Sequence, residues 1–111
     1  MIEITILDYM SNNLPVPVYM EFPSDPDNRF VVLRKGGSER ENLVDTSTFV
    51  ADSYAESLLE AAKLNEQVKA ALDSLAELDA VSCSKRGGDY PFYDTQNKHY
   101  RYQAVQNITH Y

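Results

Sequence analysis

The feature that most constrains the fold is an alternating stretch at the end of the chain, from Lys98 to Tyr111. On one side of an extended backbone fall Tyr100, Tyr102, Ala104 and Ile108, and on the other fall His99, Arg101, Gln103 and Asn107. A period of two, carried by residues that favour extended backbone, is typical of a half-buried β-strand. We therefore expect the C-terminal residues to be built into a sheet.

A long amphipathic helix is the second strong signal. Ser53 and Glu56 have the spacing of a capping box, in which each side chain satisfies a backbone N–H of the other residue at a helix start. Apolar residues then recur at steps of three and four, at Leu58, Ala61, Ala62, Val68, Leu72 and Leu75. Polar residues expected to face water are Glu56, Glu60, Lys63, Glu66, Gln67 and Lys69. The pattern predicts a helix that packs one stripe against a sheet.

Shorter signals complete the expected order of elements. Residues 2–13 combine helical spacing with a stop at Ser11–Asn13 before Pro15, which predicts a short helix. Apolar alternation and β-branched residues predict strands over 16–22, 29–35, 43–51 and 78–85, and an aromatic segment over 90–94. Breakers predict turns over 23–28, 36–42, 86–89 and 95–97. The first three strands are expected to form an antiparallel meander, and Pro17 and Pro91 are expected at sheet edges.

These elements predict one α+β domain spanning residues 1–111. Its sheet is mostly antiparallel with about five strands, and it packs against one long helix and a short N-terminal helix. The hydrophobic fraction of 43% and the charged fraction of 24% are ordinary for a soluble protein. A single cysteine, Cys83, allows no internal disulfide and is expected to be a small buried hydrophobe. The start lacks a basic leader and no apolar stretch is long enough to cross a bilayer, so synthesis in the cytosol without membrane contact is expected.

The charge balance argues against sequence-specific DNA binding. Ten Lys and Arg residues stand against seventeen Asp and Glu residues, which gives a formal net charge of −7. Because Lys and Arg must neutralise phosphates for a protein to hold DNA, an acidic chain is expected to repel it.

Motifs for catalysis are few, and we expect neither an enzyme nor a cofactor or metal. Gly36 and Gly37 lack the following Lys and Ser or Thr of a phosphate-binding loop, and the only histidines, His99 and His110, have no common metal-ligand spacing. An alternative of a different class remains open, in which Asp89, Asp94 and His99 serve a small hydrolase or a nucleotide-binding domain.

Two groups of residues are candidates for contacts with a partner protein. The first is the polar stretch expected to form a mobile tip, because exposed polar tips often carry contacts. It comprises Arg34, Lys35, Gly36, Gly37, Ser38, Glu39, Arg40 and Glu41. The second is Tyr90 and Tyr93, since tyrosine is enriched at protein–protein interfaces.

The element order and several phrases of the sequence resemble those of tail-completion proteins of long-tailed phages and prophages, and more narrowly of tail terminators. The phrases are residues 17–23 (PVYMEFP), 30–37 (FVVLRKGG), 53–58 (SYAESL) and 100–105 (YRYQAV). The resemblance spans essentially the whole chain and includes no catalytic motif.

What this resemblance implies is an α+β domain whose sheet is backed by helices and which assembles as a six-fold ring of identical copies. The ring closes the tail tube at the head–tail interface of the virion, after synthesis in the bacterial cytoplasm. Its partners are the tail tube protein and a head-completion protein, and DNA passes through without specific binding. A ring is also expected to cover sheet edges formed by Tyr90–Tyr93 and by the terminal strand. Another neck protein of the same module is the nearest alternative.

Overall fold

The computed structural model describes residues 1–25, 27–41, 44–94 and 99–110, and the side chains of Glu41, Phe92, Tyr93, Asp94 and His99 lie outside that description. In chain order, the elements are α1 (Ile2–Asn13), β1 (Val18–Tyr19), β2 (Phe30–Glu41), β3 (Val44–Ala55), α2 (Leu58–Asp73), the 3₁₀ turn η1 (Ser74–Glu77), β4 (Val81–Asp94) and β5 (His99–His110). The helix predicted over residues 2–13 is confirmed.

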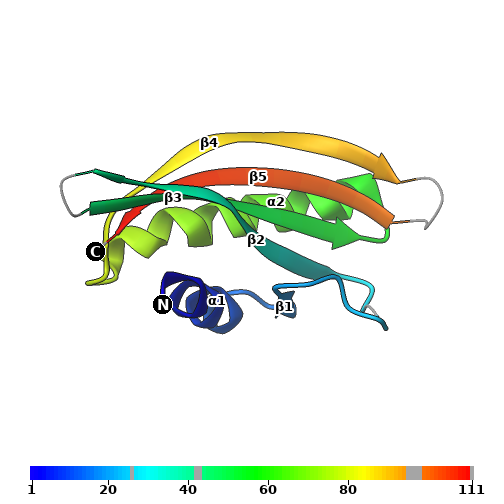
Figure 1. The fold of residues 1–111 in the computed structure, drawn as a ribbon. Helices are drawn as coiled ribbons and strands as arrows, with labels where there is room; N and C mark the ends of the chain where they lie inside the picture. The colour runs from blue at the N-terminus through cyan, green and yellow to red at the C-terminus, as the bar shows by residue number, and fades with distance from the viewer. Residues whose placement is uncertain (26, 42–43, 95–98, 111) are drawn as a thin grey trace.

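The strands form one sheet in the order β1-β2-β3-β5-β4. β1 runs parallel to β2, and all other neighbours are antiparallel. The predicted class, an α+β fold with a five-stranded mostly antiparallel sheet, one long helix and a short N-terminal helix, is therefore confirmed. The molecule is elongated, 45 × 23 × 23 Å, and Figure 1 shows the β2–β3 and β4–β5 hairpins reaching toward opposite ends of it.

Both helices lie on the same face of the sheet, which we call the helical face. The core between them and the strands contains Ile6, Met10, Val31, Leu33, Phe49, Ala51, Leu64, Val68, Leu72, Leu75, Ala104 and Ile108, among others. Every second strand residue points the other way, to what we call the open face, because successive side chains alternate across a strand. By strand pairing, the open face includes Phe30, Val32, Arg34, Thr46, Thr48, Val50, Asp52, Tyr54, Lys85, Tyr90, Arg101, Gln103, Val105, Asn107 and Thr109.

The two glycine pairs lie inside strands, so the turns predicted over 36–42 and 86–89 are wrong. β2 continues to Glu41, paired with β3, and its register shifts between Lys35 and Gly37. β4 runs from Val81 to Asp94 with a similar shift between Arg86 and Gly88. Gly88 has φ 135°, a conformation that residues with a Cβ rarely adopt. Each pair therefore lies at a β-bulge, and the strand signals on either side of Gly87 and Gly88 join into the single strand β4.

The start of the long helix lies four residues later than predicted. Ser53 and Glu56 do not cap it, because β3 continues to Ala55. Ser57 is the N-cap, and its Oγ accepts a hydrogen bond from the backbone N–H of Glu60 at 3.2 Å. The buried stripe also differs: Leu64 and Asn65 belong to it, and the Lys69 side chain is only 13% exposed rather than fully in water.

The edges of the sheet also differ from expectation. The strand predicted over 16–22 is two residues long and parallel to β2, so the expected antiparallel meander holds only for β2 and β3. Pro17 precedes this edge strand and Pro91 lies in the edge strand β4, as predicted. The terminal strand β5 is not an edge, because it pairs with β3 on one side and β4 on the other. The turn predicted over 95–97 lies outside the described residues.

Candidate functional site

The polar stretch predicted for partner contacts is strand rather than loop, and the pleat divides its side chains between the two faces. Arg34 lies on the open face, whereas Lys35 points to the helical face, where its Nζ is 3.7 Å from Glu3 Oε1. Arg40 Nε is 3.9 Å from Asp45 Oδ1 across the hairpin. The predicted set is therefore not one surface.

Part of this stretch lines a shallow polar hollow of about 420 Å³ near the β2–β3 tip. Its lining consists of Gly37, Ser38, Glu39, Thr46, Thr48 and Asn107. Thr48 Oγ1 donates to Asn107 Oδ1 at 2.9 Å, and Thr46 and Thr109 hydroxyls are 3.5 Å apart. These cross-strand pairs make the open face polar at this end.

Of the two predicted tyrosines, Tyr90 is exposed on the open face. Tyr90 has 55% of its surface exposed to solvent. Its ring lies close to Gly88, and a Cβ added to Gly88 would be 3.2 Å from Tyr90 Oη. The Tyr93 side chain lies outside the described residues.

The residues of the alternative hydrolase do not all come together. Asp89 lies opposite Ala104, whereas Asp94 lies opposite His99. The two positions are five residues apart along β5, which is roughly 17 Å at about 3.4 Å per residue. Asp89 is also engaged with α2: Lys69 Nζ donates to its Oδ2 at 2.9 Å, as does Asn65 Nδ2. Hydrogen bonding to Lys69 lowers the pKa of Asp89 below its ordinary value.

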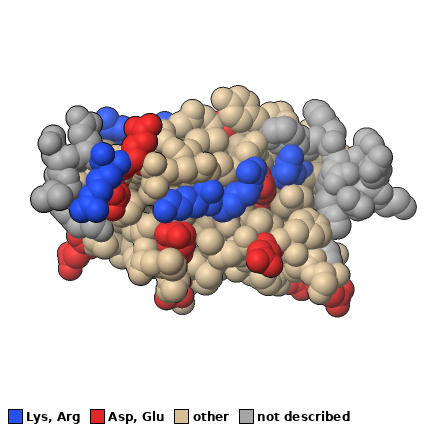
Figure 2. Space-filling model, viewed as in Figure 1, with Lys and Arg blue, Asp and Glu red and all other residues tan. Residues whose placement is uncertain are grey.

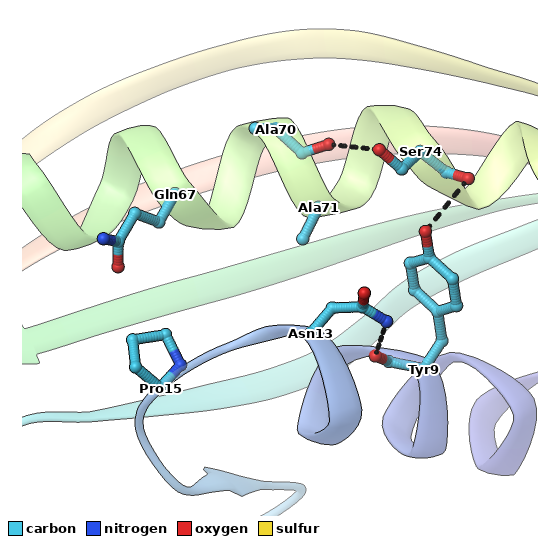
Figure 3. A pocket seen from close by; sticks show the side chains of 7 residues that line it. All are labelled: Tyr9, Asn13, Pro15, Gln67, Ala70, Ala71 and Ser74. Atoms are coloured by element: carbon cyan, nitrogen blue, oxygen red, sulfur yellow. Dashed lines mark hydrogen bonds between the residues drawn. The ribbon is translucent and has the colours of Figure 1, made fainter.

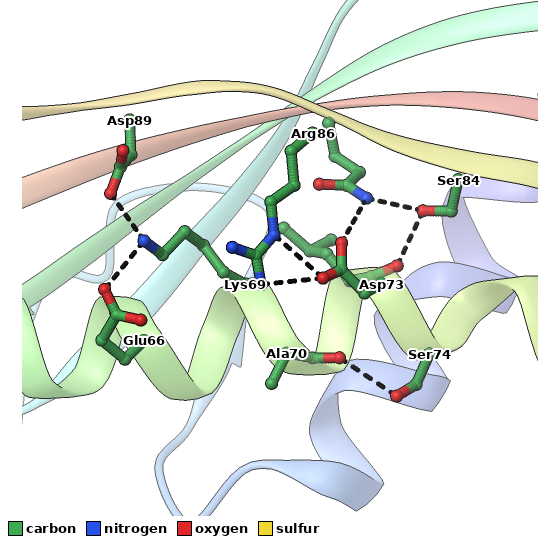
Figure 4. Close-up of polar contacts among 10 residues, drawn as sticks. Glu66, Lys69, Ala70, Asp73, Ser74, Ser84, Arg86 and Asp89 are labelled. Atoms are coloured by element: carbon green, nitrogen blue, oxygen red, sulfur yellow. Dashed lines mark hydrogen bonds and ion pairs between the residues drawn. The ribbon is translucent and has the colours of Figure 1, made fainter.

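Asp89 belongs to a polar network that joins α2 to β4 and β5 (Figure 4). Arg86 contacts Asp73 Oδ2 through Nε at 2.9 Å and through Nη2 at 2.8 Å, and this hydrogen-bonded pair raises the pKa of Arg86. Buried Gln106 donates to both Asp73 Oδ1 and Ser84 Oγ, and Ser84 in turn donates to the Leu72 carbonyl at 2.7 Å. The network holds the long helix against the edge of the sheet, which is a structural role.

Sequence reasoning missed a charged cluster at the centre of the open face. Asp52 is buried, with a side chain only 4% exposed, and its Oδ2 accepts from Arg34 Nε at 3.1 Å. Arg101 Nη1 lies 4.0 Å from the same oxygen and donates to Tyr54 Oη at 3.5 Å. Asp52 Oδ1 has no hydrogen-bond partner among the described residues. The only signal of this cluster in the sequence is Asp52 itself, an acid within a strand rich in small and β-branched residues.

Aromatic rings cover one end of the open face. Phe30 and Tyr54 are stacked with their centroids 4.7 Å apart, and Phe22 packs edge-on against both at 5.4 Å. Phe22 comes from the segment between β1 and β2 and remains 52% exposed. This end of the open face is therefore apolar, in contrast to the polar tip at the other end.

On the opposite side of the molecule, α1 and α2 enclose a hollow of about 370 Å³ (Figure 3). Tyr9 Oη donates to the Ser74 carbonyl at 3.3 Å, and Asn13 Nδ2 donates to the Tyr9 carbonyl at 2.8 Å. Ala70 and Ala71 form its apolar wall. The side chains of Tyr9, Asn13 and Ser74 donate to backbone carbonyls of other lining residues, and Gln67 alone among the lining side chains with polar atoms has no hydrogen-bond partner in the described part of the chain. A single amide indicates no particular ligand.

The described part of the chain contains no group of three or more His, Cys, Asp and Glu residues placed to hold a metal ion. None of its helices is long and apolar enough to span a membrane. No family model matches this chain, and no curated protein matches it. The feature that remains for a functional argument is the open face of the sheet.

Proposed function

We propose that the protein is a structural subunit of a long-tailed phage or prophage that closes the tail tube as a tail terminator. Six copies form a ring on the end of the tube, stop its growth and offer a surface for the head. Support comes from the resemblance in residues 17–23, 30–37, 53–58 and 100–105. The observation that carries the proposal is the fold, because a sheet backed on one face by two helices is the architecture that this resemblance implies.

Two further features favour an assembly role. One face of the sheet has neither described helix packed on it and presents charged, tyrosine and apolar side chains, which suits contact with a neighbouring protein. The chain is also strongly acidic, with a formal net charge of −7. A ring of such subunits carries a large net negative charge and would let DNA pass without holding it.

In this proposal the partners are identical copies, the tail tube protein and a head-completion protein, and the location is the head–tail interface of the virion. No residue has a catalytic role. The register between β4 and β5, which separates Asp89 from Asp94 and His99, gives no support to the hydrolase alternative.

The test is electron microscopy of lysates from the parent phage with this gene disabled. Filled heads beside separate, overlong or ragged tails are the expected result, and a plasmid-borne copy should restore normal particles. Full heads beside free tails of normal length would instead indicate a neck protein of the same module. Intact infectious particles would refute the assembly role.

A further inference from the structure

The negative charge of the chain is concentrated on the helical side. The segments 2–13 and 56–80 contain eight acids, Glu3, Asp8, Glu56, Glu60, Glu66, Asp73, Glu77 and Asp79, and two lysines. The strand residues that point to the same side add Asp45 and Asp89 against Lys35, Arg40 and Arg86, which leaves an excess of five negative charges. By contrast, the open face has three cations, Arg34, Lys85 and Arg101, against Glu39 and Asp52. In the view of Figure 2, Lys and Arg side chains form a row across the middle, and acids dominate the lower margin.

Several of these charges have no partner within the part of the chain that the structure describes. On the open face, Asp52 binds Arg34 only through Nε, and the two terminal nitrogens of Arg34 have no acceptor there. Lys85 is exposed and forms no ion pair in the same range. On the helical side, Asp8, Glu77 and Asp79 likewise lack a cation among the described residues. Glu39 on the open face also forms no ion pair in this range, so the unpaired charges of the open face have both signs, whereas those of the helical side are negative.

On both sides of the sheet, an exposed apolar side chain lies at the same end of the long axis of the molecule. α2 starts at the end of the sheet where β3 finishes, and its first turn exposes Leu59, with 64% of its surface in solvent. The exposed ring of Phe22 packs on Tyr54 at this same end of the open face. At the other end, η1 and the residues after it lead into β4, so Glu77 and Asp79 lie near the end from which Lys85 projects on the open face. Phe22 and Leu59 are therefore exposed at the same end of the molecule, and Lys85, Glu77 and Asp79 lie toward the other end.

We infer that the open face of one copy packs against the helical face of the next copy. Arg34 and Lys85 would meet unpaired acids at the α2–η1 end, and the aromatic end around Phe22 would meet Leu59. Because the two patches differ, the contact is head-to-tail and repeats from copy to copy, which closes into a ring if the rotation permits. This inference rests on the proposed function and names the surfaces that its ring would use.

Pairing of sheet edges is a less favourable way for copies to join. The edge strand β4 contains Lys85, Arg86 and Pro91 and is interrupted by two register shifts, the devices by which proteins block edge-to-edge association. At the other edge of the sheet, the part of β2 that does not pair with β1 contains Arg34, Lys35 and Arg40. The register shifts, Pro91 and the charged side chains therefore disfavour strand pairing at these edges.

The test compares Lys85→Glu with the matched control Lys63→Glu. Each change makes the net charge more negative by the same amount, but Lys85 is on the open face and Lys63 is a 64% exposed residue of the helical face. Oligomer size would be measured by native mass spectrometry and sedimentation velocity over a range of concentrations, with and without purified tail tubes. We expect Lys85→Glu to weaken assembly about tenfold or more. Lys63→Glu should not weaken it, because this change adds an acid to the face that meets cations, and Glu77→Lys with Asp79→Lys should restore assembly in the Lys85→Glu chain.

Arg34→Glu is a second variant on the same face, and far-UV circular dichroism with a urea midpoint would check that each variant folds. If the wild type assembles and Lys85→Glu and Lys63→Glu weaken assembly equally, or neither weakens it, the face-to-face contact is refuted while the proposed function stands. If the wild type stays monomeric at every concentration and on tail tubes, the ring itself is refuted, and the contact with it.

Discussion

Two identical changes, Ser57→Ala and Ser53→Ala, should have opposite effects on stability. Ser57 caps α2, and its Oγ accepts from the Glu60 N–H at 3.2 Å. Removal of a serine N-cap costs about 1 kcal/mol in the free energy of unfolding. Ser53 is fully buried in β3, and its Oγ has no hydrogen-bond partner among the described residues. A buried unpaired hydroxyl itself costs about 1–3 kcal/mol, so its removal should be neutral or stabilising by up to about 1 kcal/mol after the loss of packing.

The assay is urea unfolding followed by circular dichroism at 222 nm, at low protein concentration and repeated at a second concentration to exclude effects of assembly. At this chain length a loss of 1 kcal/mol lowers Tm by about 4–8 °C, so Ser57→Ala should be clearly visible in a thermal scan. The slope of the urea dependence should match the wild type in both variants. If Ser53→Ala lowered the free energy of unfolding by about 1 kcal/mol and Ser57→Ala had no effect, the helix would start at Ser53 and the assignment of Ser57 as its N-cap would be wrong.

Three other changes test the packing and the charge network. Asp89→Asn should lower the free energy of unfolding by less than about 1 kcal/mol at pH 7, since the pair is partly exposed. Because hydrogen bonding to Lys69 lowers the folded-state pKa of Asp89, this contribution is complete above the unfolded-state value and disappears as pH falls below about 4. Urea titrations from pH 7 to pH 2.5 should show wild type and variant converging, and a constant difference would refute the pairing. Gly88→Ala should cost about 1–3 kcal/mol in urea unfolding, since φ is 135° and the new Cβ would crowd Tyr90, while Gly37→Ala, with open space around it, is the matched control. Phe49→Ala, in the fully buried core, should cost about 3–5 kcal/mol by the same assay, and a loss below about 1 kcal/mol would contradict the packing.

The existence and type of most elements could be predicted from periodicity, but strand lengths could not. Gly36–Gly37 and Gly87–Gly88 carry the local signature of turns. In the structure each pair lies at a register shift within a long strand, because the partner strand continues past it: Gly37 pairs with Thr48, and Gly88 pairs with Val105. A glycine pair permits a turn and a bulge equally, and the length of the neighbouring strand decides between them.

The helix start shows the same limit. Ser53 with Glu56 and Ser57 with Glu60 both satisfy the capping rule, four residues apart. The choice between them depends on a contact distant in sequence, the stacking of Tyr54 on Phe30 across β2 and β3. That contact keeps residues 53–55 extended, and no local pattern reports it.

The candidate site was the least predictable part. The cluster of Arg34, Asp52 and Arg101 forms because three strands align in one register, and a shift of one residue in any of them would move a charge to the helical face. Sequence reasoning selected Arg34 only as part of a supposed loop. Tyr90 is exposed on the open face, and its role in a partner contact stays a prediction.

The interior position of β5 has a consequence for how the protein is made. β5 lies between β3 and β4 and is the only strand that pairs with β4. A nascent chain that has emerged only as far as residue 94 therefore lacks the strand that joins β3 to β4. Until residues 99–110 insert, β4 has no partner strand and β3 is an edge of the remaining sheet. Folding therefore waits for the last strand, and newly made copies cannot begin to associate on the ribosome before translation of that strand is complete.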